Sequence, residues 1–190
     1  MPYFEKIPGE RIYLSPMDPG DLEIYTKWLN DVEVTRWLGQ YSAVYSLPAE
    51  RAWLENATKD VNNYLFAIVL RDGDRLIGNI GLVDLNQIHR RATLGIFIGQ
   101  AEDRSKGYGA EAIRLLLGYG FNWLGYGFNW LGYGFNWLGL RNIDLHVDSE
   151  NARAIACYTK AGFKEYGRRH GVKFRDGAWH DDVLMEALAR

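Results

Sequence analysis

The spacing of apolar residues changes along the chain between helical and strand periods, and these changes predict its elements. Residues 11–15 form a first apolar run, which predicts a strand. Behind a capping sequence with Pro19 at the first helical position, four apolar residues recur at helical spacing: Leu22, Tyr25, Trp28 and Leu29. Ser46 and Pro48 open a second predicted helix, which continues through Ala57. The first third of the chain therefore predicts a strand followed by two helices.

The middle of the chain predicts consecutive strands. Residues 64–70 are an unbroken apolar run, Asp72-Gly73 is a hairpin turn, and residues 75–83 form the next strand. Residues 92–98 complete an antiparallel meander. A crossover helix from about Ala110 then leads to a strand at residues 143–147. This order predicts a mixed α/β fold of the α+β type in one domain, residues 1–190.

The C-terminal part predicts a helix, two strands and a charged connection. Residues 151–158 read as a helix that ends at Ala161-Gly162, where glycine suits the left-handed cap. Residues 163–166 and 182–188 are the last two predicted strands. The segment between them carries four basic residues, Arg168, Arg169, Lys173 and Arg175. We expect this charged arm to be a solvated loop.

A glycine-rich turn separates the strand at 92–98 from the crossover helix. The backbone can approach a ligand closely at two glycines, and the free N–H groups of a helix start favour an anion. Two basic side chains add positive charge at the same place. We therefore predict a phosphate or pyrophosphate site formed by Arg104, Ser105, Lys106, Gly107, Tyr108, Gly109 and Ala110.

Other readings of this turn fit less well. A plain helix-opening loop is an alternative, because a lone Gly-x-Gly is weak evidence. A dinucleotide fingerprint expects an acidic residue about 20 positions onward, and Asn129 stands there. The phosphate-loop pattern of nucleotide triphosphatases, Gly-x-x-x-x-Gly-Lys-Ser/Thr, does not occur in the chain.

Composition narrows the class of protein further. The chain has 190 residues with 47% hydrophobic content, enough for one well-cored domain. Its net charge of −2 predicts no general attraction to nucleic acid or to an anionic membrane. The single Cys157 excludes an internal disulfide and a cysteine-based metal site, which fits a reducing compartment. The N-terminus lacks the apolar core of a signal peptide, so we expect a cytoplasmic protein without membrane spans.

Two motifs carry a resemblance to a known family. They are Arg104-x-x-Gly107-x-Gly109-Ala110 and, after the next strand, Asn151-x-x-Ala154-x-x-x-Tyr158-x-x-x-Gly162-Phe163. Together they resemble the acetyl-CoA-dependent N-acetyltransferases of the GNAT superfamily. Four further stretches resemble the branch with ribosomal-protein N-terminal acetyltransferases and spermidine acetyltransferases: residues 9–14, 28–31, 89–92 and 174–177.

The resemblance implies a mostly antiparallel mixed sheet, splayed where acetyl-CoA binds, and a role for several residues. The coenzyme pyrophosphate would lie on the backbone of residues 106–110, and the strand ending in Phe97 and Ile98 would pair with pantetheine. Tyr158 would donate a proton to the departing thiolate, and Asn151 would contact the coenzyme or order a water. No metal is implied. Acetyl transfer to a primary amine follows, with a protein α-amine as the expected acceptor, and polyamines or other small amines as alternatives. A coenzyme-binding protein without turnover is a further alternative.

The sequence departs from the family at the position of the general base. Many relatives carry glutamate where this chain has Thr93, and threonine is no base at neutral pH. The remaining candidates are His89, His146 and Asp148, each of which we expect to be structural or solvated. Cys157 lies beside Tyr158 but about 100° around a helix from it, so we expect it to pack rather than to act as a nucleophile.

The second departure is a repeat. Residues 118–138 are three copies of Gly-Tyr-Gly-Phe-Asn-Trp-Leu, so the crossover helix has gained two heptads. Two copies could loop out, or a longer helix could carry the last third of the chain to a second protomer. The swap is favoured, since extruded aromatic residues would expose an apolar patch. It predicts a homodimer, which light scattering that finds only monomer would contradict. An assembly module that binds no coenzyme is a third hypothesis.

Overall fold

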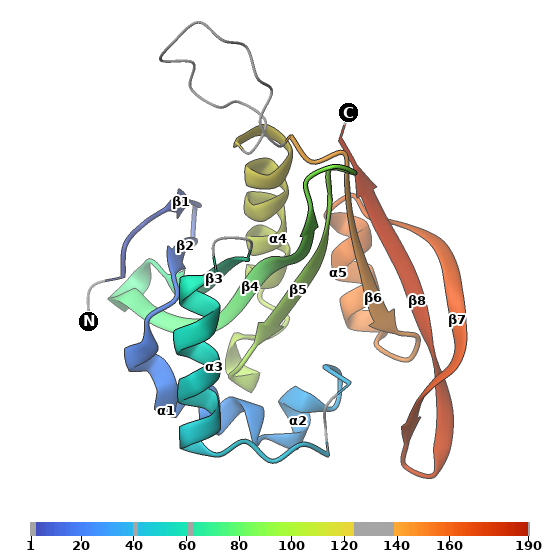
Figure 1. Cartoon of the computed structure of the whole chain (residues 1–190), viewed down its shortest axis with the longest axis horizontal. Coiled ribbons are helices and arrows are strands. Elements are labelled where there is room, and N and C mark those ends of the chain that lie inside the picture. Colours follow the sequence, from blue (N-terminus) through green and yellow to red (C-terminus); the bar gives the residue numbers. More distant parts are fainter. Residues whose placement is uncertain (1–2, 40–41, 61–62, 124–138, 190) are drawn as a thin grey trace, which may run out of the picture.

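The fold is one mixed sheet with helices on both faces (Figure 1). The structure is a computed structural model that describes residues 3–39, 42–60, 63–123 and 139–189. Its eight strands lie in the order β1-β2-β3-β4-β5-β6-β8-β7. Every neighbouring pair is antiparallel except β5 and β6, because the connection between these two crosses over through a helix. The predicted α+β class and mostly antiparallel sheet are confirmed.

The predicted elements are present with small shifts of their ends, except that β7 and β8 extend into the predicted charged arm. The strands are β1 (Ile7–Pro8), β2 (Ile12–Pro16), β3 (Tyr64–Leu70), β4 (Arg75–Asn86), β5 (Arg91–Ile98), β6 (Asn142–Asp148), β7 (Lys164–Arg175) and β8 (Ala178–Leu188). The helices are α1 (Leu22–Leu29), α2 (Val32–Thr35), α3 (Leu47–Lys59), α4 (Tyr108–Gly118) and α5 (Ala152–Lys160). Short turns of helix complete the set: η1 (Pro19–Asp21), η2 (Asp72–Asp74), η3 (Ala101–Asp103) and the π-helical η4 (Tyr119–Trp123).

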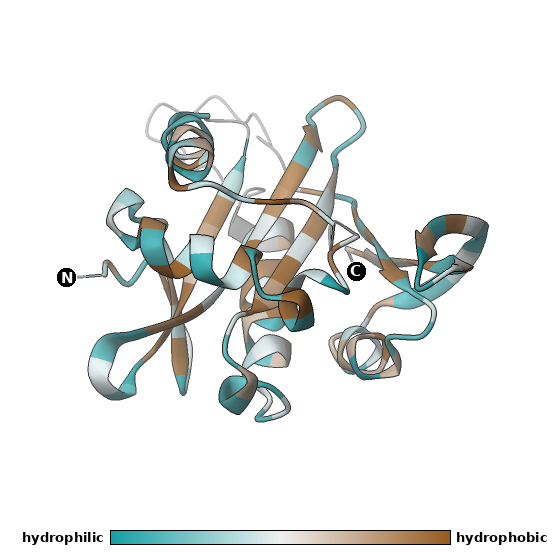
Figure 2. Ribbon diagram, turned by 90° about the horizontal axis from the view of Figure 1, so that it is seen from below, coloured by the Kyte–Doolittle hydropathy of each residue, from teal (hydrophilic) through white to brown (hydrophobic). Residues whose placement is uncertain are grey.

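The alternation of side chains along β3 explains why both faces of this part of the sheet are covered. Phe66 and Ile68 point into the cluster that contains α4 and packs against α5. Ala67 and Val69 point into the other cluster, with α1 and α3. Because successive residues of a strand face opposite sides, an unbroken apolar run needs cover on both. Hydrophobic residues accordingly run along the central strands (Figure 2).

Strands β5 and β6 pair over a short distance and then separate. Their parallel ladder consists of Arg91 with Asn142, Ala92 with Ile143, and Thr93 with Asp144. Beyond Thr93, β5 continues to pair with β4 on its other side, through Ile98. We call the opening between residues 94–98 of β5 and residues 145–148 of β6 the fork. It confirms the predicted splay of the sheet.

The charged arm is not a loop, so that prediction is wrong. Residues 164–188 form a long antiparallel hairpin of β7 and β8, with irregular register near residues 165–167 and 169–173. Arg175 in particular is 2% exposed. A strand with one solvated face carries many charges, and the partners that allow Arg175 to be buried lie far away in the sequence.

Only the first six residues of the repeat, 118–123, are among the described residues. Its first copy continues α4 into η4, where Tyr119 packs its ring on those of Tyr64 and Phe66. Gly120 O accepts a hydrogen bond from Leu140 N at 3.3 Å, so the chain leaves and re-enters the fold at neighbouring points. Residues 124–138 lie outside the described residues, and so does the choice between a looped and a swapped arrangement.

None of the helices among the described residues is long and apolar enough to cross a membrane.

Candidate active site

The glycine-rich turn leads into a helix start whose first N–H groups have no side-chain cap. Gly107 has φ of 88° and is the N-cap of α4, with no side-chain acceptor for the first N–H groups of the helix. Ser105 also adopts a positive φ, 61°. Such a left-handed conformation is least costly for glycine. Helix N–H groups without a cap, at the positive end of the dipole, suit a phosphate group.

An arginine and a glutamate hold this turn in place. Arg11 Nη1 donates to Lys106 O at 2.8 Å, and its guanidinium lies 5.0 Å from the centre of the Tyr108 ring. Glu111 Oε1 accepts from the backbone N–H groups of Glu10 and Arg11 at 2.8 and 2.9 Å. Burial acts to raise the pKa of Glu111, but these N–H groups and Arg11 lower it overall. The first turn of α4 is thus tied to the start of β2, a contact that sequence spacing could not reveal.

The basic residues of the turn have different surroundings. Arg104 donates from Nε to Ile98 O at 3.2 Å and from Nη2 to Gly99 O at 2.7 Å. It therefore fixes the end of β5 as well as adding charge. Lys106 and Ser105 are exposed. An approaching anion would meet the ammonium of Lys106 without displacing an internal contact.

The fork presents a strand edge that leads away from the turn. Phe97 packs its ring against Trp28 of α1, with centroids 6.0 Å apart, while Ile98 packs against the opposite cluster. Both side chains are therefore anchored, and the backbone between residues 94 and 98 has no ladder partner on the β6 side. Unpaired N–H and C=O groups of this kind can pair with an extended amide-bearing ligand.

Helix α5 carries the predicted phenol and packs it against the core. Tyr158 is partly buried against Phe163, with ring centroids 5.9 Å apart, and burial raises the pKa of its hydroxyl. It is therefore protonated at neutral pH, as a proton donor must be. Asn151 is the N-cap of α5, and its Oδ1 accepts from Ala154 N at 3.1 Å. This bond fixes the start of the helix, and the predicted contact of Asn151 with coenzyme remains a prediction.

Cys157 packs between the two helices of this face. A Cβ added to Gly109 would lie 3.9 Å from Cys157 Sγ, which puts α5 next to the first turn of α4. Burial raises the pKa of the thiol. A neutral thiol in van der Waals contact with α4 supports the expected packing role.

The three base candidates taken from the sequence differ in their surroundings. His89 is exposed in the turn between β4 and β5. Asp148 is 0% exposed and bound to Arg175; burial acts to raise its pKa, but Arg175 and the backbone N–H of Glu150 lower it overall. His146 reaches solvent, although desolvation by its surroundings lowers the pKa of its ring. The predicted structural role of Asp148 is supported.

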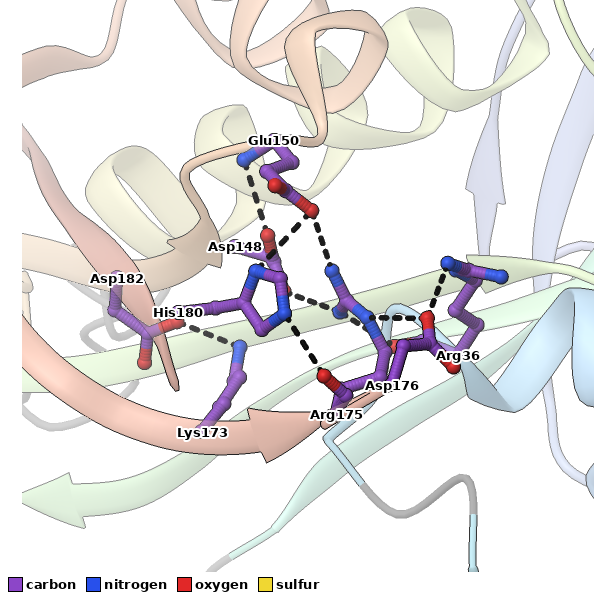
Figure 3. A network of polar contacts seen from close by, with 8 residues as sticks. All are labelled: Arg36, Asp148, Glu150, Lys173, Arg175, Asp176, His180 and Asp182. Carbon is purple, nitrogen blue, oxygen red and sulfur yellow. Dashed lines mark hydrogen bonds and ion pairs between the residues drawn. The ribbon is translucent and has the colours of Figure 1, made fainter. Parts of the chain in front are cut away.

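The buried Arg175 is the centre of a polar network that joins three parts of the chain (Figure 3). Its Nη1 lies 2.6 Å from Asp148 Oδ2, and its Nη2 lies 2.8 Å from Glu150 Oε2. Its guanidinium is also 5.1 Å from the centre of the Trp37 ring. His180 contacts the same Glu150, with Nδ1 3.2 Å from Oε2. We call these contacts the Arg175 clamp; it links the β7–β8 hairpin, the segment after α2 and the residues before α5.

Thr93 has a carboxylate beside it that sequence reasoning missed. Its Oγ1 donates to Asp144 Oδ1 at 2.9 Å, across the last pair of the parallel ladder. Only the register of β5 and β6 brings these two residues together, so no local signal could have identified Asp144. Among the described residues, no group of side chains could hold a metal ion.

The geometry suits a long ligand with a phosphate at one end and amides along its length. An acyl-coenzyme A has this form, and the fold and site therefore define an acyl-coenzyme A-dependent transferase. The protein-family model described as "Acetyltransferase (GNAT) domain" matches residues 11–164. The chain belongs to this GNAT acetyltransferase family and is an N-acetyltransferase that uses acetyl-CoA.

Individual relatives match this chain over most of their length. Spermidine N(1)-acetyltransferase of Escherichia coli is 29% identical over 175 residues, which cover 92% of this chain and 84% of the relative. The N-acetyltransferase p20 of Bacillus licheniformis is 23% identical over 188 residues, 98% of this chain and 97% of the relative. The crystal structure of spermidine N-acetyltransferase from Vibrio cholerae, in complex with CoA and spermine, superposes with a TM-score of 0.80 at 25% identity, covering 94% and 96% of the two chains.

Proposed function

We propose that the protein transfers the acetyl group of acetyl-CoA directly to a primary amine of a polyamine. The observation that carries this proposal is a pair of carboxylates next to the fork. Asp144 and Glu186 are register partners on β6 and β8, and no ion pair with either exists among the described residues. Directly opposite residues of an antiparallel pair lie side by side on one face. Two negative groups in this position favour an acceptor with more than one ammonium.

The relatives point to the same acceptor class. Those of Escherichia coli and Vibrio cholerae are named for spermidine, and the Vibrio cholerae structure includes spermine. A protein α-amine, the acceptor expected from sequence, carries one ammonium, so the second carboxylate would have no partner on it. Peptides with a free α-amine are therefore included in the test below.

The reaction needs no covalent enzyme intermediate. The neutral amine attacks the thioester carbonyl carbon, and backbone N–H groups along the fork would stabilise the developing oxyanion. The carbon–sulfur bond then breaks as the nitrogen loses a proton to solvent; Tyr158 supplies a proton to the leaving thiolate and regains one from solvent. The coenzyme pyrophosphate would rest on residues 106–110, with Phe97 and Ile98 beside the pantetheine.

The test is thiol release with a panel of acceptors. The protein is incubated with acetyl-CoA and, in turn, spermidine, spermine and peptides with a free N-terminus. We expect thiol release to be fastest with a polyamine, together with acetylated polyamine by mass spectrometry. Release with peptides alone would transfer the proposal to an α-amine. Coenzyme binding without release from any acceptor would make the protein a binder without turnover.

We also propose that the protein is a cytoplasmic homodimer. In the described residues β6 pairs with β5 of the same chain, so the swap through residues 118–138 that the repeat favours would form this same pairing between two protomers. A spermidine N-acetyltransferase structure from Vibrio cholerae is described as dodecameric, so assembly occurs among the relatives.

A further inference from the structure

The narrow end of the fork brings a hydroxyl and a carboxylate together. Thr93 and Asp144 are the last pair of the parallel ladder, and the strands separate directly after them. Thr93 Oγ1 donates to Asp144 Oδ1 at 2.9 Å, which fixes the orientation of the carboxylate. Asp144 is therefore held at the point where the two strands part.

The second oxygen of this carboxylate is available. In the residues that the structure describes, no hydrogen bond or ion pair involves Asp144 Oδ2, and the side chain is half-buried. The neighbouring acids of the same face differ in this respect. Asp148 is bound to Arg175, and Asp182 is bound to Lys173 and Arg169. Within β6, Asp144 is thus the acid that keeps a carboxylate oxygen without a partner among the described residues.

The fork spans the distance along β5 between the Thr93–Asp144 pair and the glycine-rich turn. Five residues of β5, from 94 to 98, separate Thr93 from the segment that leads into the turn. At about 3.3 Å per residue they span about 17 Å. A coenzyme arm that starts at the turn and follows this edge brings its far end, the thioester, to Asp144.

Acid and base lie on opposite faces of the sheet. Ala92, Leu94 and Ile143 point into the cluster against which Tyr158 packs. Because side chains alternate along a strand, Thr93 and Asp144 point to the other face. An amine that approaches from the Asp144 face can attack the thioester while the sulfur departs toward the Tyr158 face.

We propose that Asp144 is the catalytic residue that takes the proton from the acceptor amine, and that Thr93 positions it. This inference rests on the proposed amine acetylation. The ammonium gives its proton to Asp144 Oδ2, directly or through a water, and the freed nitrogen pair forms the C–N bond. The C–S bond breaks as the nitrogen loses its second proton to solvent, the thiolate takes the proton of Tyr158, and the phenolate regains a proton from solvent. Asp144 then releases its proton to solvent.

The test uses Asp144→Asn, which keeps an oxygen for the Thr93 hydrogen bond but cannot accept the proton. With spermidine we expect kcat/KM to fall at least about 100-fold, the lower range for loss of a general base. The loss should shrink with primary amines of decreasing pKa, because these need less help to deprotonate. Calorimetry should find unchanged coenzyme A affinity, which separates a chemical defect from misfolding.

Other titratable or charged groups face Asp144 and require controls. They are Arg91 on β5, His146 on β6, Tyr166 on β7 and Glu186 on β8. Glu186→Gln is the matched carboxylate control. It should raise KM for spermidine without causing a loss of rate that varies with amine pKa. His146→Gln tests the rival base and should likewise cause no loss that varies with amine pKa. Thr93→Val should cost about tenfold, and Thr93→Ser should restore the rate.

The outcomes separate this inference from the proposed function. If wild-type protein releases thiol and Asp144→Asn is as fast as wild type with every amine, the role of Asp144 is overturned and the proposed function stands. The same follows if His146→Gln, and not Asp144→Asn, causes a loss of rate that shrinks as the amine pKa decreases. Release with peptides in place of spermidine would change the acceptor, and the variants would be compared on that amine. No release from any amine would overturn both proposals.

Discussion

The two halves of the sheet solve the problem of burial differently. Strands β2 to β5 are covered on both faces, by α1 and α3 on one side and α4 on the other. Strands β6, β8 and β7 bury one apolar face, with Val147, Val183 and Met185 in the core, and carry ionic residues on the other. The fork lies at the junction of these halves. Apolar packing on both faces therefore stabilises the first half, while the second provides charged groups that can meet an amine.

The largest effects on stability are expected from replacing one buried residue in each half. Arg175→Met leaves Asp148, which is 0% exposed, without its cation, and should lower the free energy of unfolding by about 3–5 kcal/mol. Ile68→Ala, at a position 0% exposed in the first half, should cost about 2–5 kcal/mol through its cavity. Urea unfolding measures both.

The two losses should differ in whether a second change relieves them. Adding Asp148→Leu to Arg175→Met removes the unpaired buried charge and should recover part of the stability. Arg168→Met is the control, because this exposed residue of the same hairpin should tolerate the change. A double variant less stable than Arg175→Met would show that the clamp is not governed by charge burial.

A smaller effect is expected where the first half depends on a single carboxylate. Glu111→Gln puts an amide N–H₂ group among the N–H donors of Glu10 and Arg11 and should cost about 1–3 kcal/mol at neutral pH. Because the folded pKa of Glu111 lies below its ordinary 4.5, its stabilisation is full above pH 4.5 and is lost as the pH falls through the folded value.

Unfolding of wild type and variant at pH 7 and in acid checks this sign. The difference in stability between them should narrow as the solution is acidified, and the exposed Glu102→Gln should show no such trend. A difference that widens in acid would refute the assignment of Glu111 as an ionised anchor.

The sequence predicted the first half of the sheet better than the second, for a physical reason. Residues 64–70 and the turn at Asp72-Gly73 were placed correctly, because a strand buried on both faces is an apolar run. The charged arm was placed in a loop because its charges are neutralised by partners that only tertiary structure supplies. Arg175 and Asp148 are 27 residues apart along the chain.

The candidate site divides in the same way. The glycine-rich turn and Tyr158 belong to local motifs, so spacing was enough to find them. Asp144 acquires its position from its pairing with Thr93, 51 residues earlier, and Glu111 from its pairing with the start of β2. Contacts that depend on strand register or helix docking have no local sequence signal.

The central claim is that the fork and the glycine-rich turn together hold the coenzyme, and amide hydrogen exchange with and without coenzyme A tests it most directly. We expect slower exchange for the amides of residues 94–98 that point toward β6 and for those of residues 107–110, because these would gain hydrogen-bond partners. The amides of β2 and β3, which are already paired, should change little. Unchanged exchange in both segments at saturating coenzyme A, or protection confined to other parts of the chain, would contradict the account.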